Sequence, residues 1–130
     1  MLRGFLLSVA LLNGTIRNCS PPGSIGTILD MGIDPVNPKA GDTSTLWVEF
    51  DLAREVTGGT ATYSYTLNYI PFPGDVIPLC DQTNCPLPAG VNNVSGETVF
   101  PDVSGRIEVQ IDWTTSEETP IWCVKTTYSV

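Results

Sequence analysis

Apolar and polar residues alternate along much of the chain, with the period of two that is typical of β-strands with one buried face. No stretch of ten residues follows the 3.6-residue period of an amphipathic helix. Turns rich in glycine and proline separate the alternating stretches, which predicts an all-β sandwich of antiparallel hairpins. The expected strands lie at residues 24–34, 46–52, 60–69, 98–100, 106–113 and 121–130.

Two of these strands have a face that we expect to form core. In the most regular stretch, every second side chain from Ile107 to Trp113 is apolar, and polar side chains lie between them. Residues 46–52 repeat the pattern, with Leu46 and Leu52 at the two ends of the apolar face. Both faces are also candidates to line a ligand cavity, because ordinary core and cavity wall share one pattern.

The stretch from Tyr69 to Gly90 interrupts the alternation. It reads YIPFPGDVIPLCDQTNCPLPAG and contains five prolines and two cysteines. Because proline removes a backbone donor, we expect an ordered irregular loop instead of a helix or a central strand. The segment carries more apolar side chains than a solvated loop needs. That apolar surface either packs on the core or lines a ligand entrance.

Four cysteines are available, and they indicate disulfide bonds. Cys80 and Cys85 lie five residues apart across a polar span suited to a turn. A metal site would need further thiols or imidazoles, and the chain has no histidine, so neither a metal nor a cofactor is expected. Four cysteines allow three pairings, and the residues alone do not choose between them.

The N-terminal residues 1–12, MLRGFLLSVALL, predict a short signal peptide, and an N-terminal strand of the fold is the alternative. Residues 13–130 are then one domain of a soluble, mature protein. Three Asn-x-Ser/Thr sequences fit a secretory route. Asn13 and Asn93 are the expected glycosylation sites, whereas Asn18 precedes a cysteine expected in a disulfide.

The amino-acid composition argues against several classes of function. The formal net charge of −8 argues against nucleic acid and against simple electrostatic docking on anionic membranes. Without histidine, and with Lys39 and Lys125 as the two lysines, catalysis has few candidate groups, so the chain is not expected to be an enzyme. Paired carboxylates such as Glu117 and Glu118 are typical of solvated turns.

A family resemblance emerges from several segments taken together. The run IPFPGDVIPLC, the ring CDQTNCPL, the strand RIEVQIDW and the ending IWCVKTTYSV occur in that order. Together they resemble the ML lipid-recognition domain, the family of the Niemann-Pick type C lysosomal sterol carrier and the group-two mite allergens. The resemblance covers about residues 16–130. It implies an immunoglobulin-like two-sheet antiparallel β-sandwich with an apolar cavity between the sheets.

The resemblance also implies a disulfide pairing and a set of ligand-binding residues. It pairs Cys19 with Cys123 and Cys80 with Cys85. It places Phe72, between two prolines, at the mouth of a lipid cavity, with Ile70 beside it. The further lipid-binding residues that we expect on this basis are Val48, Phe50, Tyr65, Leu67, Phe100, Val103, Val109 and Ile111.

The function that the resemblance implies is binding and transfer of one lipid, sterol or phospholipid-like, held between the sheets. The expected partners are this lipid and, transiently, membranes or a lipid-receiving protein, and the expected state is a monomer. The expected location is the extracellular space or the endolysosomal or vacuolar lumen. The alternative is a secreted adhesion or carbohydrate-binding module that has no internal ligand and uses exposed aromatics such as Trp47 and Trp122.

Overall fold

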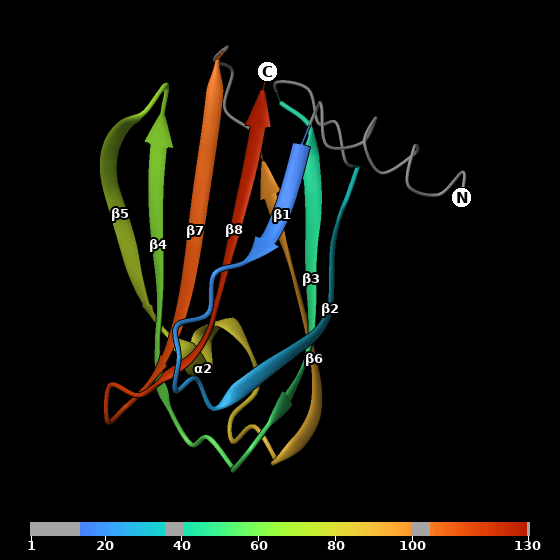
Figure 1. Ribbon diagram of the computed structural model, residues 1–130, viewed down its shortest axis with the longest axis vertical. Coiled ribbons are helices and arrows are strands. Elements are labelled where there is room, and N and C mark those ends of the chain that lie inside the picture. Colours follow the sequence, from blue (N-terminus) through green and yellow to red (C-terminus); the bar gives the residue numbers. More distant parts are fainter. Residues whose placement is uncertain (1–13, 36–40, 100–104, 130) are drawn as a thin grey trace.

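The structure, a computed structural model, describes residues 14–35, 41–99 and 105–129. Within these residues, eight strands form two antiparallel sheets. The two sheets face each other (Figure 1). The strands are β1 (Gly14–Asn18), β2 (Gly26–Asp34), β3 (Thr43–Leu52), β4 (Gly59–Leu67), β5 (Ile70–Pro78), β6 (Gly90–Val99), β7 (Arg106–Thr115) and β8 (Pro120–Ser129). The predicted β-sandwich is confirmed.

One sheet has five strands in the order β1-β8-β7-β4-β5, and the other has three in the order β2-β3-β6. A single helical turn, α2 (Leu79–Gln82), follows β5. In Figure 1 it lies near the lower ends of β4 and β5. Within the described residues, no helix has the length and apolar character needed to cross a bilayer.

The core forms where the alternating faces of the two sheets meet. Phe50 on β3 is fully buried and packs edge-on against Trp113 and Trp122, with ring centroids 5.8 and 5.9 Å away. The two indoles stack on each other with centroids 4.4 Å apart. Offset stacking and edge-to-face contacts are the favoured geometries for aromatic rings, so this cluster joins the two sheets toward the end at which β3 and β7 finish.

The prediction of an irregular loop after Tyr69 is wrong for residues 70–78, which form the edge strand β5. A strand at a sheet edge has a neighbour on one side, so half of its N–H groups need no partner in the sheet and prolines are tolerated. Gly74 lies at the irregularity in the β4–β5 register, where a Cβ atom would overlap the carbonyl oxygen of Tyr63. Glycine therefore permits the bulge that keeps this proline-rich segment paired.

Two strands were not predicted in full. β1 was not expected as a strand, and for β6 only residues 98–100 were expected. Both segments form strands because they pair with a neighbouring strand. β1 pairs with β8, β6 pairs with β3, and neither pair has a register shift.

Both predicted disulfides are present, and no described cysteine is free. Cys19, directly after β1, is bonded to Cys123 on β8, and the Cys19 backbone N–H donates to the Cys123 carbonyl at 2.9 Å. The bond joins the start of the described chain to its last strand. Cys80 on α2 is bonded to Cys85, which closes a small ring after β5.

Candidate functional site

A cavity of about 500 Å³ lies between the two sheets. The five-stranded sheet contributes Tyr63, Tyr65, Ile77, Ile111, Trp113 and Trp122 to its wall. The three-stranded sheet contributes Leu46, Val48, Val94, Ser95, Gly96 and Glu97, and α2 contributes Asp81 and Gln82.

The sheet order explains why the cavity lies where it does. β1 and β8 contact β2, which brings the sheets together along one side. β5 and β6 are the edge strands on the other side, and both supply cavity-lining residues. The sandwich is therefore hollow toward the side where β5 and β6 are the edges.

A smaller hollow of about 50 Å³ adjoins the cavity, since Leu46, Tyr63, Tyr65 and Ile111 line both. Its other lining residues are Ile33, Ser44, Val109, Thr126 and Tyr128. Ser44 and Thr126 are buried polar residues, and Tyr128 is buried as part of the hydrophobic core. The two hollows together extend the space between the sheets away from α2.

Two tyrosine hydroxyls make hydrogen bonds beside the cavity. The Tyr63 hydroxyl donates to Oε1 of Gln82 on α2 at 2.6 Å, and the Tyr65 hydroxyl makes a long contact of 3.5 Å with Oδ2 of Asp75. Burial raises the pKa of Tyr63 above its ordinary value of 10.0. Burial is also the largest cause of the raised pKa of Tyr65, and the negative charge of Asp75 adds to it. Both phenols are therefore neutral hydrogen-bonding groups at physiological pH.

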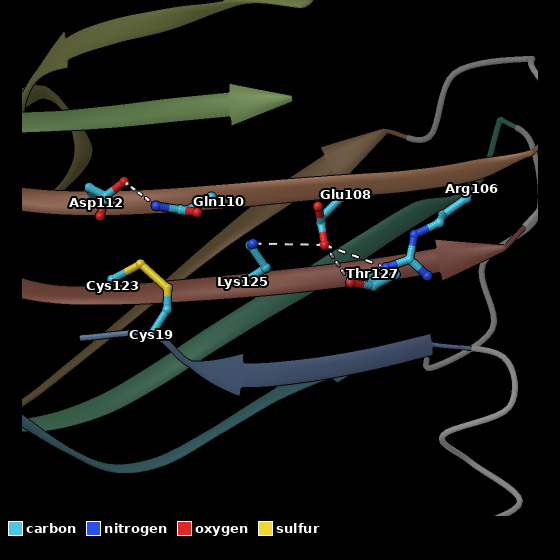
Figure 2. Close-up of polar contacts among 8 residues, drawn as sticks. All are labelled: Cys19, Arg106, Glu108, Gln110, Asp112, Cys123, Lys125 and Thr127. Atoms are coloured by element: carbon cyan, nitrogen blue, oxygen red, sulfur yellow. Dashed lines mark hydrogen bonds and ion pairs between the residues drawn. A yellow bond between two sulfur atoms is a disulfide. The ribbon is translucent and has the colours of Figure 1, made fainter. Parts of the chain in front are cut away.

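The charged residues of the cavity wall are Asp81 and Glu97, both exposed. None of the described lining residues is a lysine or an arginine. Figure 2 shows Arg106 and Lys125 on the outer face of the five-stranded sheet, where both pair with Glu108. The described wall thus has two carboxylates and no cation, and Arg106 and Lys125 lie on the opposite face of the five-stranded sheet.

The structure brings several of the predicted lipid-binding residues together. Val48, Tyr65 and Ile111 line the main cavity, and Val109 lines the adjoining hollow. The role of these four residues in lipid binding stays a prediction.

The other predicted residues lie elsewhere. Phe50 is in the aromatic core cluster, and Leu67 packs on Ile107 and its buried neighbours. Phe72 and Ile70 on β5 are 50% and 62% exposed and are not among the cavity-lining residues. Phe100 and Val103 fall outside the described residues. The expected roles of Phe72 and Ile70 also stay predictions.

Sequence reasoning missed part of the wall. Trp113 and Trp122 line the cavity, and alternation along β7 and β8 was a signal that could have identified them. The α2 residues Asp81 and Gln82 had no such signal, because the chain reversal after β5 brings them to the cavity.

The alternative function needed Trp122 to be exposed and the sandwich to lack a cavity. Trp122 is instead 2% exposed and stacks in the core, so that expectation is wrong. Trp47 is partly exposed, as expected, on the outer face of the three-stranded sheet.

Comparisons with known proteins agree on one fold. A family model described as the ML domain matches residues 14–130. The crystal structure of a Niemann-Pick type C2 protein from the Japanese carpenter ant is 18% identical, with a TM-score of 0.68 over 88% of this chain and 98% of that chain. Chicken MD-1 complexed with lipid IVa is 12% identical, with a TM-score of 0.66 over 89% of this chain and 88% of that chain. No curated protein matches the chain.

Proposed function

This chain belongs to the ML-domain family, and we propose that it is a lipid-binding and lipid-transfer protein that holds one lipid between its two sheets. The observation that carries the proposal is the cavity of about 500 Å³ walled by side chains of both sheets. Binding sites for small molecules occupy roughly 300 to 1,000 Å³ and are lined mainly by apolar and aromatic groups. The aromatic and aliphatic residues of this cavity fit that description.

The energetic cost of empty space inside a protein indicates that this cavity is filled. Core-truncation data give about 24 cal/mol for each Å³ of cavity. At that rate an enclosed, empty space of 500 Å³ would cost a large part of the stability of a domain, but this cavity is partly open to solvent. The space between the sheets therefore holds solvent or a ligand. An apolar ligand that buries on the order of 400 Å² of its surface would gain roughly 10 kcal/mol before association costs.

A structural relative supports the choice of lipid as ligand, because chicken MD-1 of similar fold was solved with lipid IVa. A sterol and a phospholipid-like molecule both remain candidates for the lipid of this chain. The role is binding and transfer instead of catalysis, with transient contact to membranes or a lipid-receiving protein, and the protein acts as a monomer.

The proposed setting is the extracellular space or the endolysosomal or vacuolar lumen. Two disulfides suit an oxidising compartment. Residues 1–12, proposed as a signal peptide, and the proposed glycosylation site Asn13 lie outside the described residues. The second proposed site, Asn93, is exposed on β6.

The test uses two valines of one strand. Val94 lines the cavity, whereas Val91 on the same strand is 60% exposed and is not among the lining residues. Val94→Trp should place an indole in the cavity and reduce lipid loading, and Val91→Trp should leave loading unchanged. Loading is measured by native mass spectrometry of purified protein, followed by lipid extraction, and by displacement of a fluorescent fatty probe.

The comparison is valid only if both variants fold. We expect Val94→Trp to fold because the new ring enters existing space instead of a packed core. Near-ultraviolet circular dichroism and urea unfolding of both variants check this. Equal probe binding by folded Val94→Trp and Val91→Trp protein would show that lipid does not occupy the cavity. Wild-type protein that carries no lipid and binds no probe would favour the adhesion or carbohydrate-binding alternative.

A further inference from the structure

We propose that the small hollow beside the cavity is a subsite for an uncharged hydroxyl group of the ligand, formed by Ser44, Thr126 and Tyr128. The preferred ligand is then a lipid that carries a hydroxyl at the end that enters the hollow. This inference rests on the proposed function, because it concerns the same space between the sheets. It names the chemical class of lipid, which the fold alone does not decide.

Buried hydroxyl side chains from both sheets line this hollow. Ser44 on β3 is 1% exposed, and Thr126 and Tyr128 on β8 are 3% and 5% exposed. In the β7–β8 pair, Thr126 lies opposite Val109, which lines the same hollow. A buried hydroxyl is costly unless it has hydrogen-bond partners, so these groups favour a ligand that supplies one.

The hydrogen bonds of these hydroxyls leave room for a further partner. The Ser44 hydroxyl donates to the carbonyl oxygen of Pro35 at 3.4 Å, which is long compared with the usual range of about 2.5 to 3.0 Å between oxygen atoms. Thr126 and Tyr128 share a side-chain hydrogen bond. Because a hydroxyl donates one hydrogen bond and accepts up to two, Ser44 and Thr126 can also bond a ligand hydroxyl.

The hollow offers no partner to a charged group. None of its described lining residues is charged, and Asp81 and Glu97 line the main cavity instead. Burial raises the pKa of Tyr128 above 10.0, although the hydrogen bond with Thr126 acts in the opposite direction, so the phenol is neutral at physiological pH. An unpaired carboxylate or ammonium costs far more to bury than a hydroxyl, so this wall selects an uncharged group.

The size of the hollow and its position suit the end of a longer ligand. A site needs roughly 10 to 15 Å³ to admit a water molecule, and the hollow has about 50 Å³. Leu46 and Ile111 belong to the walls of both the hollow and the cavity, so a lipid chain in the cavity can extend its end into the hollow. Bound water is the competing occupant, and the experiment decides between the two.

The experiment compares decanol with decanoate, which have one chain length and different ends. Each displaces a neutral fluorescent probe from the full chain at pH 7, below the solubility limit and below micelle formation, and the affinity of the probe is measured for every variant. Ser44→Ala and Thr126→Val each remove one hydroxyl. We expect each variant to bind decanol about fivefold more weakly than the wild type, because one hydrogen bond between uncharged groups is lost. Decanoate binding should change less than about twofold, because its carboxylate does not enter the hollow.

Thr115→Val is the matched control. Thr115 on β7 is 5% exposed, and it lines neither the cavity nor the adjoining hollow. Its hydroxyl oxygen accepts a hydrogen bond from the Thr119 N–H at 3.1 Å, so this variant also loses a buried hydroxyl and a hydrogen bond of the fold. We expect it to bind decanol with wild-type affinity. Near-ultraviolet circular dichroism verifies that all three variants are folded.

Nuclear magnetic resonance of labelled protein with unlabelled decanol locates the two ends of the ligand. The protons beside the decanol hydroxyl should show Overhauser contacts with Ile33 and Val109, which line the hollow and not the main cavity. The terminal methyl group should contact Val48 or Val94, which line the main cavity and not the hollow.

Four results would overturn the inference and leave the proposed function standing. These are unchanged decanol affinity in both Ser44→Ala and Thr126→Val, an equal loss in Thr115→Val, equal weakening of decanol and decanoate, and contacts of the terminal methyl group with Val109. The first of these would mean that water fills the hollow. If neither the amphiphiles nor the probe bind the wild-type protein, the proposed function fails as well.

Discussion

The indole of Trp47 lies against Gly32 on the neighbouring strand, so close that a Cβ atom on Gly32 would come within 2.6 Å of the ring carbon Cζ2. The two residues are direct cross-strand partners in the β2–β3 pair. Trp47 remains 37% exposed, so its ring covers the glycine backbone on the outer face of the sheet. Because glycine has no side chain, the backbone at this point would be exposed to solvent, and the aromatic ring of Trp47 covers it.

We expect Gly32→Ala to cost about 1 kcal/mol of unfolding free energy, because the new methyl group must displace the ring into solvent. In the Trp47→Ala background the same substitution should be neutral or stabilising by roughly 0.5 to 1 kcal/mol, since alanine loses less backbone freedom than glycine in a strand. Urea unfolding of the four proteins gives the double-mutant cycle. Strictly additive effects would show that the ring and the glycine do not interact energetically.

The two disulfides should differ in their contribution to stability. Cys19 and Cys123 are 104 residues apart, whereas Cys80 and Cys85 are five apart. In the chain-entropy model the long loop contributes nearly 5 kcal/mol and the short ring about 2 kcal/mol. Replacing both cysteines of one pair by alanine and measuring urea unfolding tests this ranking. A larger loss from the Cys80–Cys85 pair would mean that strain or local packing outweighs chain entropy.

Alternation predicted the strands whose two faces differ in burial. β7 is the clearest case, because Ile107, Ile111 and Trp113 are buried and the residues between them are not. β5 was not predicted as a strand, because Pro71 and Pro73 argue against a strand unless it is known to lie at the edge of a sheet. Edge position is a property of the whole sheet, and no local pattern contains it. Most of β6 was not predicted for a related reason. Its small polar residues show no clear alternation, and they form a strand because they pair with β3.

The cavity wall was predictable only in part. Alternation identifies inward residues such as Val48 and Ile111, but core and cavity wall share this pattern. Whether the two sheets touch or stay apart depends on how edges far apart in sequence are brought together. The two carboxylates of the wall come from α2, which pattern analysis did not assign, and from β6, of which it assigned only the end. Asp81 and Glu97 are therefore recognised as lining residues of one cavity only in three dimensions.

Alkaline pH should destabilise the protein through its buried tyrosines. Burial raises the pKa of Tyr63 and Tyr128 above the ordinary value of 10.0. The folded chain then holds these protons more tightly than the unfolded chain does, so the unfolding free energy falls as pH rises above 10.0. This stabilisation is complete below that pH and is lost as pH passes the folded-state pKa values.

The check is urea unfolding of the wild type and of the Tyr63→Phe, Tyr128→Phe double variant between about pH 8 and 11. Phenylalanine keeps the rings but has no proton to lose, so the unfolding free energy of the variant should fall less steeply above pH 10.0. The absolute stability of the variant also reflects the lost Tyr63 to Gln82 hydrogen bond, and for that reason the slopes are compared. Equal slopes would assign the alkaline loss to other groups.

The last prediction tests whether Phe72 lies at the cavity mouth, the role expected from the family resemblance, or belongs to the core. Phe72 on β5 is 50% exposed and Ile111 on β7 is 7% exposed. Ile111→Ala should cost about 2 to 5 kcal/mol of unfolding free energy, and Phe72→Ala less than the roughly 3 to 5 kcal/mol typical of a fully buried phenylalanine. If the Phe72 ring gains apolar contacts from bound lipid, Phe72→Ala should also weaken probe binding by folded protein. A Phe72→Ala variant that unfolds as readily as Ile111→Ala, yet binds the probe with wild-type affinity, would assign Phe72 to the core and leave the lipid contact of β5 unsupported.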